Sequence, residues 1–154
     1  TYGLSEGADY RGVDVRIVYD RRGPAGTGDK RKVWQASEPA IEKAGLGQVM
    51  IPRKTNSAIS HNKFFVLLRD GGPAAVWTGS TNVTWGGLFG QSNVGHLVRD
   101  TGVAARFLDY WTRLSSDPAY ATLRPANTEA SPTPATPPAP GIGTVFSPRT
   151  TLPS

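Results

Sequence analysis

The sequence predicts an α/β domain, in which a mixed β-sheet is flanked by helices, followed by a disordered proline-rich C-terminal tail. Three observations predict this class. Short apolar segments alternate with turn signals of Gly, Asp and Pro up to about residue 100. One longer segment then has the apolar spacing of an amphipathic helix. Beyond residue 124 the chain is dominated by Pro, Ala and Thr, which bury too little apolar surface to offset the entropy of ordering.

The first part of the chain predicts two short strands, a loop and a short helix. Apolar and polar residues alternate in the first strand. The loop is basic and rich in turn residues. The helix begins near a proline, which suits the first helical turn, and ends before a glycine, which suits the position after a helix. The predicted ranges are Val13–Tyr19 for the first strand, Asp20–Arg31 for the loop, Glu38 or Pro39 to Ala44 for the helix, and Gln48–Pro52 for the second strand.

The middle of the chain predicts a β-hairpin. His61–Leu68 and Ala74–Gly79 are apolar strands, and Arg69–Pro73 between them contains Asp-Gly and Gly-Gly pairs that tolerate a positive φ. Trp85–Gly90 is expected to be a glycine-rich loop, and Asn93–Arg99 a further strand.

One amphipathic helix follows the strands. Thr101 is expected to cap a helix that runs from Gly102 to about Leu114. Its apolar stripe consists of Val103, Phe107, Tyr110 or Trp111, and Leu114. This stripe must dock on the sheet, because an exposed stripe of this width is unfavourable in water. The pair Asp117-Pro118 is expected to end the helical region.

The tail divides the chain into three expected parts. Pro125–Pro140 is expected to be an extended linker, and Thr144–Phe146 resembles the beginning of another strand. We therefore expect a folded domain over residues 1–124, a linker over residues 125–142, and the start of a second, truncated unit over residues 143–154.

Composition excludes several classes of protein. The chain has no cysteine, which excludes a disulfide framework and any thiolate-bound zinc or iron–sulfur centre. It contains no apolar run of about 18 residues, so no integral membrane segment is expected. Its net charge of +5 favours anionic partners. The first residues lack the profile of a signal peptide, and the chain does not begin with Met, so we expect the true N-terminus to lie elsewhere and the compartment stays open.

The strongest chemical feature is a pair of short motifs, one on each side of the predicted hairpin. His61 and Lys63 begin one strand, and Gly79, Ser80 and Asn82 follow the next. Spacing by two places His61 and Lys63 on one face of a strand, and the hairpin returns the chain beside them. Together these residues offer a nucleophile or proton shuttle and donors for the non-bridging oxygens of a phosphate diester. A lone H-x-K is commonly a surface pair, but G-S-x-N one hairpin later makes the combination more specific.

At these motifs the chain resembles the phospholipase D superfamily, whose signature is H-x-K-x4-D-x6-G-[SG]-x-N. Ile59–Asp100 is most similar to bacterial two-repeat members, and the resemblance extends from about Val13 to Leu114. It implies that residues 1–124 form one repeat of a phospholipase D-like fold. Gly143–Arg149 resembles the opening strand of a second repeat.

The resemblance also implies a mechanism without metal or cofactor. His61 would attack phosphorus to form a phosphohistidine, and Lys63 and Asn82 would complete the catalytic set. Ser80 would bind the phosphate oxygens. A second histidine would protonate the leaving alcohol and then activate water. It would come from another H-x-K repeat, either downstream in the parent chain or in a homodimer partner.

Four positions depart from the family pattern or lie outside it. Leu68 stands where the motif aspartate is expected, and Asp70 is interpreted as a turn residue. Asn93 stands where many members carry a carboxylate. It is expected to bind the substrate phosphate together with Ser80, as a less important site residue. His96 lacks a lysine two residues later and is interpreted as a packed or hydrogen-bonded structural histidine. A metal site there is not expected, because no other metal-ligating side chains cluster near it in the sequence.

Two further groups have both a functional and a structural interpretation. Trp85 and Phe89 either line a pocket for acyl chains or bases, or pack within their loop. A basic cluster either steers phosphates or is a solvated loop. Its members are Arg21, Arg22, Lys30, Arg31 and Lys32.

The function predicted from this sequence is hydrolysis of a phosphodiester, with a phospholipid headgroup ester as the preferred substrate on the family resemblance alone. The alternatives are a nuclease of the same superfamily, and a catalytically incompetent half that acts as a structural or interaction domain. The sequence leaves the localisation unknown: a soluble protein is expected, either in the bacterial cytoplasm or secreted. Because one H-x-K is present, we expect the chain alone to expose an apolar sheet face and to have little activity.

Overall fold

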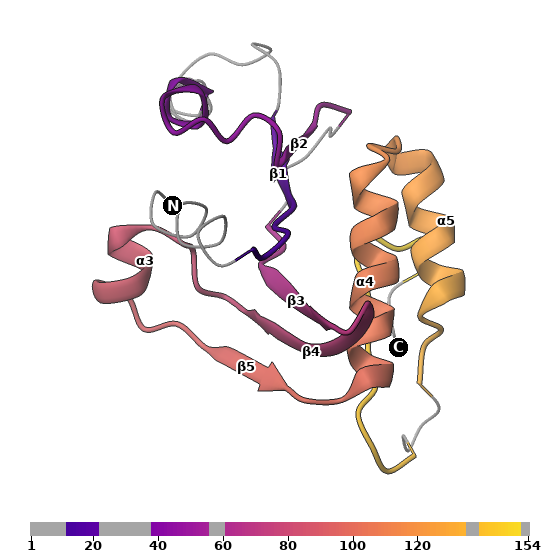
Figure 1. The fold of residues 1–154 in the computed structure, drawn as a ribbon. Coiled ribbons are helices and arrows are strands. Elements are labelled where there is room, and N and C mark those ends of the chain that lie inside the picture. Colours follow the sequence, from indigo (N-terminus) through magenta and orange to yellow (C-terminus); the bar gives the residue numbers. More distant parts are fainter. Residues whose placement is uncertain (1–11, 22–37, 56–60, 135–138, 152–154) are drawn as a thin grey trace. The chain divides into compact units, whose positions relative to one another are not determined.

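The computed structural model describes residues 12–21, 38–55, 61–134 and 139–151. The chain forms two compact units, Thr1–Ser60 and His61–Ser154. Both contain a small sheet with helical segments, which confirms the mixed α/β class (Figure 1).

In the first unit, β1 (Ile17–Asp20) pairs in parallel with β2 (Met50–Arg53). A helical segment over residues 38–43 lies between them in sequence, as expected for a parallel pair, and Gly45 follows it with a φ of 64°. The first strand is shorter than predicted, because residues 13–16 form no ladder in the described structure. Most of the predicted basic loop lies outside the described residues.

The second unit is built on a three-stranded antiparallel sheet in the order β3-β4-β5. Its strands are β3 (Phe64–Arg69), β4 (Gly72–Gly79) and β5 (Gly95–Val98), with β4 in the centre. The predicted hairpin is confirmed. Its two turn residues, Asp70 and Gly71, have φ angles of 53° and 77°, as a type I′ turn requires.

One face of this sheet is covered by α4 (Thr101–Ser115). The ring of Phe64 lies 5.2 Å from that of Phe107 and 5.7 Å from that of Tyr110. The helix cap differs by one residue from the prediction: the carboxylate of Asp100 accepts the N–H of Val103 at 2.8 Å. Asp100 precedes the helix in an extended conformation, which the cap position needs, whereas Thr101 is already helical.

The opposite face of the sheet carries a second set of apolar side chains. Phe65 packs on Trp77, with ring centroids 5.4 Å apart. Phe65, Leu67 and Leu97 are each about half exposed. This face is therefore apolar but only partly covered.

Two helices replace predicted irregular segments. The expected glycine-rich loop contains α3 (Trp85–Phe89), which begins because the hydroxyl of Thr84 accepts the N–H of Gly87. The expected linker begins inside α5 (Tyr120–Ala130), which includes Pro125. The prediction that the helical region ends at Asp117-Pro118 is therefore wrong, and so is the start of the linker at residue 125.

Tertiary contacts explain why α5 extends past its proline. Leu123 and Asn127 are fully buried, and the guanidinium of Arg113 on α4 donates to the side-chain carbonyl of Asn127 at 3.1 Å. Figure 1 shows α4 and α5 side by side. Packing of this helix outweighs the cost of one missing backbone hydrogen bond.

The C-terminal segment of the second unit, described over residues 139–151, forms no strand and packs on the rest of that unit. Phe146 is buried, and its ring stacks on that of Tyr110 with centroids 4.5 Å apart. The predicted strand at Thr144–Phe146 is thus absent from the described structure. Among the helices of the described ranges, none combines the length and hydropathy that a membrane span needs.

Candidate active site

The two sequence motifs meet at the end of the β3–β4 hairpin. The N–H of Gly79 donates to the carbonyl oxygen of Lys63 at 3.2 Å, and the hydroxyl of Thr78 donates to the same oxygen at 3.2 Å. These bonds continue the antiparallel pairing one residue beyond β3, so that Lys63 lies opposite Gly79. The H-x-K segment and the G-S-x-N segment are therefore neighbours, as predicted.

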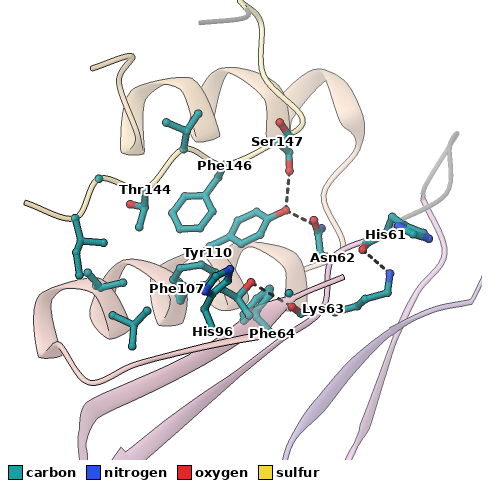
Figure 2. Close-up of a pocket in the computed structure, with 17 residues that line it drawn as sticks. His61, Asn62, Lys63, Phe64, His96, Phe107, Tyr110, Thr144, Phe146 and Ser147 are labelled. Atoms are coloured by element: carbon teal, nitrogen blue, oxygen red, sulfur yellow. Dashed lines mark hydrogen bonds between the residues drawn. The ribbon is translucent and has the colours of Figure 1, made fainter. Parts of the chain in front are cut away.

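His61 and Lys63 form the exposed side of this junction. The ammonium of Lys63 donates to the carbonyl oxygen of His61 at 2.8 Å, and partial burial lowers the pKa of Lys63. The side chain of His61 is exposed. In Figure 2 both side chains point away from the aromatic cluster around Tyr110, whereas Asn62 points toward it. The alternation expected of a strand thus holds for the three motif residues.

Ser80 and Asn93 are held together by hydrogen bonds. The hydroxyl of Ser80 accepts the N–H of Val94 at 3.0 Å and donates to the side-chain oxygen of Asn93 at 3.4 Å. The amide of Asn93 donates in turn to the carbonyl of Gly87 at 2.7 Å. Asn93 therefore links the residue after β4 to α3, as an amide can and a carboxylate, which only accepts, cannot.

Asn82 lies between Ser80 and α3, and its side chain is exposed. Its carbonyl oxygen accepts the N–H of Thr84 at 2.9 Å. A Cβ atom on Gly87 would lie 2.3 Å from that same oxygen, so only glycine allows α3 to pack this closely on Asn82. The predicted site residues after β4 thus form one tightly packed loop.

Two more glycines permit close approach of β5 to β4. A Cβ on Gly79 would lie 2.1 Å from the carbonyl oxygen of Val94, and one on Gly95 would lie 2.8 Å from the ring of Trp77. The glycine of the G-S-x-N motif is therefore required by packing between neighbouring strands.

A pocket of about 510 Å³ lies beside the motif in the second unit (Figure 2). Its walls come from the ends of β3, β4 and β5, from α4 and from the C-terminal segment. Most of the lining is aromatic or aliphatic. The labelled residues that line it are His61, Asn62, Lys63, Phe64, His96, Phe107, Tyr110, Thr144, Phe146 and Ser147.

His96 differs from its predicted environment. It is exposed and lines this pocket rather than packing in the core. The strand pairing places it opposite Thr78, on the face that α4 covers, but here the pocket leaves it accessible. In Figure 2 it lies on the aromatic side of the site, away from the ring of His61.

Leu68 and Asp70, the two positions compared above with the motif aspartate of the resemblance, lie at the far end of the hairpin. Leu68 is about half exposed, and the β3–β4 register shifts between Leu67 and Leu68. Asp70 occupies the turn with a positive φ, which supports its interpretation as a turn residue. Neither side chain lies at the motif junction.

Trp85 and Phe89 are the most exposed large apolar side chains described, at 81% and 71%. Their rings contact each other with centroids 4.6 Å apart on α3. Of the predicted basic cluster, Arg21 forms an ion pair with Glu38 at 2.8 Å, and the other four members lie outside the described residues.

Sequence reasoning missed the partner of Asn62. The amide of Asn62 donates to the hydroxyl of Tyr110 at 2.8 Å, although 48 positions separate the two residues. Tyr110 was expected only as part of an apolar stripe. Its hydroxyl on a core-facing position is the signal that such a stripe also carries a polar contact.

Within the described ranges, no cluster of three or more His, Asp or Glu side chains is placed to hold a metal ion. Comparison with protein-family models, curated proteins and solved structures finds no match to this chain.

Proposed function

We propose that this protein is a phosphodiesterase of the phospholipase D type. The observation that carries the proposal is the pairing of Lys63 with Gly79, because it joins an H-x-K segment to a G-S-x-N segment in one small region. That region offers an exposed imidazole beside a partly buried ammonium. A phosphodiester needs such a combination, since it must be attacked at phosphorus while its anionic oxygens are neutralised.

In the proposed reaction a ring nitrogen of His61 forms a bond to phosphorus, and the bond from phosphorus to the leaving alkoxide breaks. A general acid gives the leaving oxygen its proton. Water then attacks the phosphohistidine and loses a proton to the group that had acted as general acid. This step releases the phosphomonoester and free His61. Lys63, Ser80 and Asn82 bind the non-bridging oxygens during both steps. Without substrate the hydroxyl of Ser80 donates to Asn93. In the proposed reaction it donates to the phosphate instead, because a hydroxyl has one proton to donate.

The general acid is proposed to be the histidine of a second H-x-K repeat, in the parent chain or in a homodimer partner. His96 does not fit this task, because it lies on the aromatic side of the site. Phe65, Leu67 and Leu97 form a half-exposed apolar face. This face supports an association with another H-x-K repeat.

A phospholipid headgroup ester is the preferred substrate. Trp85 and Phe89 are exposed on α3, and α3 is packed against Asn82 and hydrogen-bonded to Asn93. Aromatic side chains at the edge of a site favour a substrate that is apolar on one side and charged on the other. The nuclease alternative is supported by the net charge of +5 and by stacking of bases on the same rings.

One assay separates these possibilities. Phosphatidylcholine vesicles and single-stranded DNA are incubated side by side with the chain, and with any longer natural chain that contains it, in the presence of EDTA. Release of headgroup that depends on His61 supports the preferred substrate, and cleavage of DNA that depends on His61 supports the nuclease. Absence of both activities in every form that carries two H-x-K segments would leave only the structural role.

A further inference from the structure

The H-x-K segment lies outside the sheet ladder. β3 begins at Phe64, so residues 61–63 are not part of a strand. On the sheet side the segment is fastened through the carbonyl of Lys63. On the helix side it is fastened through Asn62, whose amide donates to Tyr110 on α4. Figure 2 shows this bond from Asn62, the residue between His61 and Lys63, to Tyr110 in the aromatic cluster.

Tyr110 is well suited to act as a fixed anchor. It is 2% exposed, and its hydroxyl both accepts from Asn62 and donates to the carbonyl of Ser147 at 2.7 Å. Its ring is stacked on Phe146 at an interplanar angle of 20° and also contacts Phe64. A buried phenol with its donor and acceptor both in use holds a single orientation.

The residues beyond Tyr110 are anchored as well. The N–H of Phe146 donates to the hydroxyl of Ser131 at 3.0 Å, and the guanidinium of Arg149 donates to the carbonyl of Ser131 at 2.6 Å. The amide of Asn127 donates to the carbonyl of Pro148 at 3.1 Å. The C-terminal segment therefore forms a strap, defined here as residues 143–149, that is held to α5 and supports Tyr110.

We propose that Tyr110 is a positioning residue for His61 and Lys63, and that the strap holds Tyr110 in the orientation that binds Asn62. This inference rests on the proposed function for its catalytic meaning, but its geometry stands independently. The inference also gives the strap a role within residues 61–154, whereas the sequence alone predicted that residues 143–154 begin a separate unit. The Asn62–Tyr110 bond supports the H-x-K segment from the helix side.

The first test measures geometry without activity. The chain has two histidines, so its imidazole NMR spectrum has two sets of signals, which His96→Gln assigns. Tyr110→Phe is expected to shift or broaden the His61 signal and the backbone amide signals of Asn62 and Lys63. The indole signal of Trp77, which packs on Phe65 in the sheet, should stay in place, which shows that the fold is intact.

Tyr120→Phe is the matched control, because it removes a phenol hydroxyl from α5 at a site away from the motif. It should leave the His61 signal unchanged. Asn62→Ala should produce the same displacement as Tyr110→Phe, and the double variant should be no further displaced than either single one, because both remove the same contact. An unchanged His61 signal in Tyr110→Phe, or fully additive effects in the double variant, would overturn the proposal.

The strap is tested by Phe146→Leu in the full chain, with Val145→Ala as its control, since Val145 is exposed and Phe146 is buried. Phe146→Leu should displace the His61 signal and Val145→Ala should not. If Phe146→Leu leaves that signal in place while Tyr110→Phe moves it, the strap's part of the proposal fails.

The second test uses kinetics with bis(p-nitrophenyl) phosphate as the probe. Tyr110→Phe should lower kcat by about 10- to 100-fold and change KM little, because misplacing a nucleophile slows the chemical step more than binding. Absence of diesterase activity in wild-type protein of a form that carries two H-x-K segments would count against the proposed function, whereas the NMR result would still decide the positioning of His61. An unchanged kcat in an active protein would overturn the positioning role.

Discussion

The backbone N–H of Gly79 donates to the carbonyl oxygen of Lys63 at 3.2 Å, and this bond helps to join the two halves of the candidate site. It exists because the hairpin turn at Asp70 and Gly71 sets the register of β3 against β4. On its other side, the α carbon of Gly79 lies so close to Val94 that no side chain fits. The position of Lys63 therefore depends on a turn and a glycine rather than on contacts of its own ammonium.

The first prediction concerns the nucleophile. His61→Ala should lower diesterase turnover by at least about 10³-fold, because it removes the group proposed to form the covalent bond to phosphorus. The measurement is release of alcohol from a diester by the form of the protein that contains two H-x-K segments. His96→Ala is the control and should keep most of the activity. Near-normal turnover in His61→Ala would contradict the assignment.

The second prediction concerns the contact between β4 and β5. Gly79→Ala should lower the free energy of unfolding by about 1–3 kcal/mol, because its methyl group would overlap the carbonyl oxygen of Val94 and force the strands apart. Urea denaturation measures this change. Gly72→Ala on the same strand is the control, since its nearest neighbour would lie 3.9 Å away. Equal stabilities for the two variants would show that the strands do not approach this closely.

The third prediction concerns the hairpin turn. Gly71→Ala should lower the free energy of unfolding by about 1–2 kcal/mol, because Gly71 has a φ of 77° and a side chain is strained there. Asp70→Asn should be tolerated, since Asn also adopts this conformation, and thermal unfolding measures both variants. If Asp70→Asn also removes diesterase activity without affecting stability, then Asp70 has a chemical role that its turn position does not explain.

The fourth prediction concerns pH. Burial raises the pKa of Tyr19 to about 12, and its hydrogen bond of 2.7 Å to Glu38 adds to this effect. The folded chain then holds a proton that the unfolded chain, with a tyrosine pKa near 10.0, releases earlier. The contribution of Tyr19 to stability is therefore complete below pH 10 and is lost as the pH rises toward 12.

Ultraviolet titration of tyrosinate, with Tyr19→Phe subtracted, measures this pKa. Glu38→Gln should lower the pKa of Tyr19, because it removes a negative charge beside the phenol while an acceptor oxygen is kept. A pKa that does not change in Glu38→Gln would show that the carboxylate does not contribute.

Local patterns determined the parts of this protein that depend on neighbouring residues. The Asp70-Gly71 turn is specified by two residues that tolerate a positive φ, and strand alternation follows from it. The register of this hairpin then brings His61 and Lys63 next to the G-S-x-N segment. The stripe that includes Phe107 and Tyr110 likewise predicted α4, because apolar side chains at helical spacing must be buried.

Only the tertiary structure decided the features that depend on residues far apart in sequence. α5 extends through Pro125 because Asn127 is buried against Arg113 of α4, and local propensity at a proline cannot anticipate that contact. The strap lies on α4 because the ring of Phe146 stacks on that of Tyr110. The bond from Asn62 to Tyr110 spans 48 positions, and its energy appears only after the sheet and the helix have packed together.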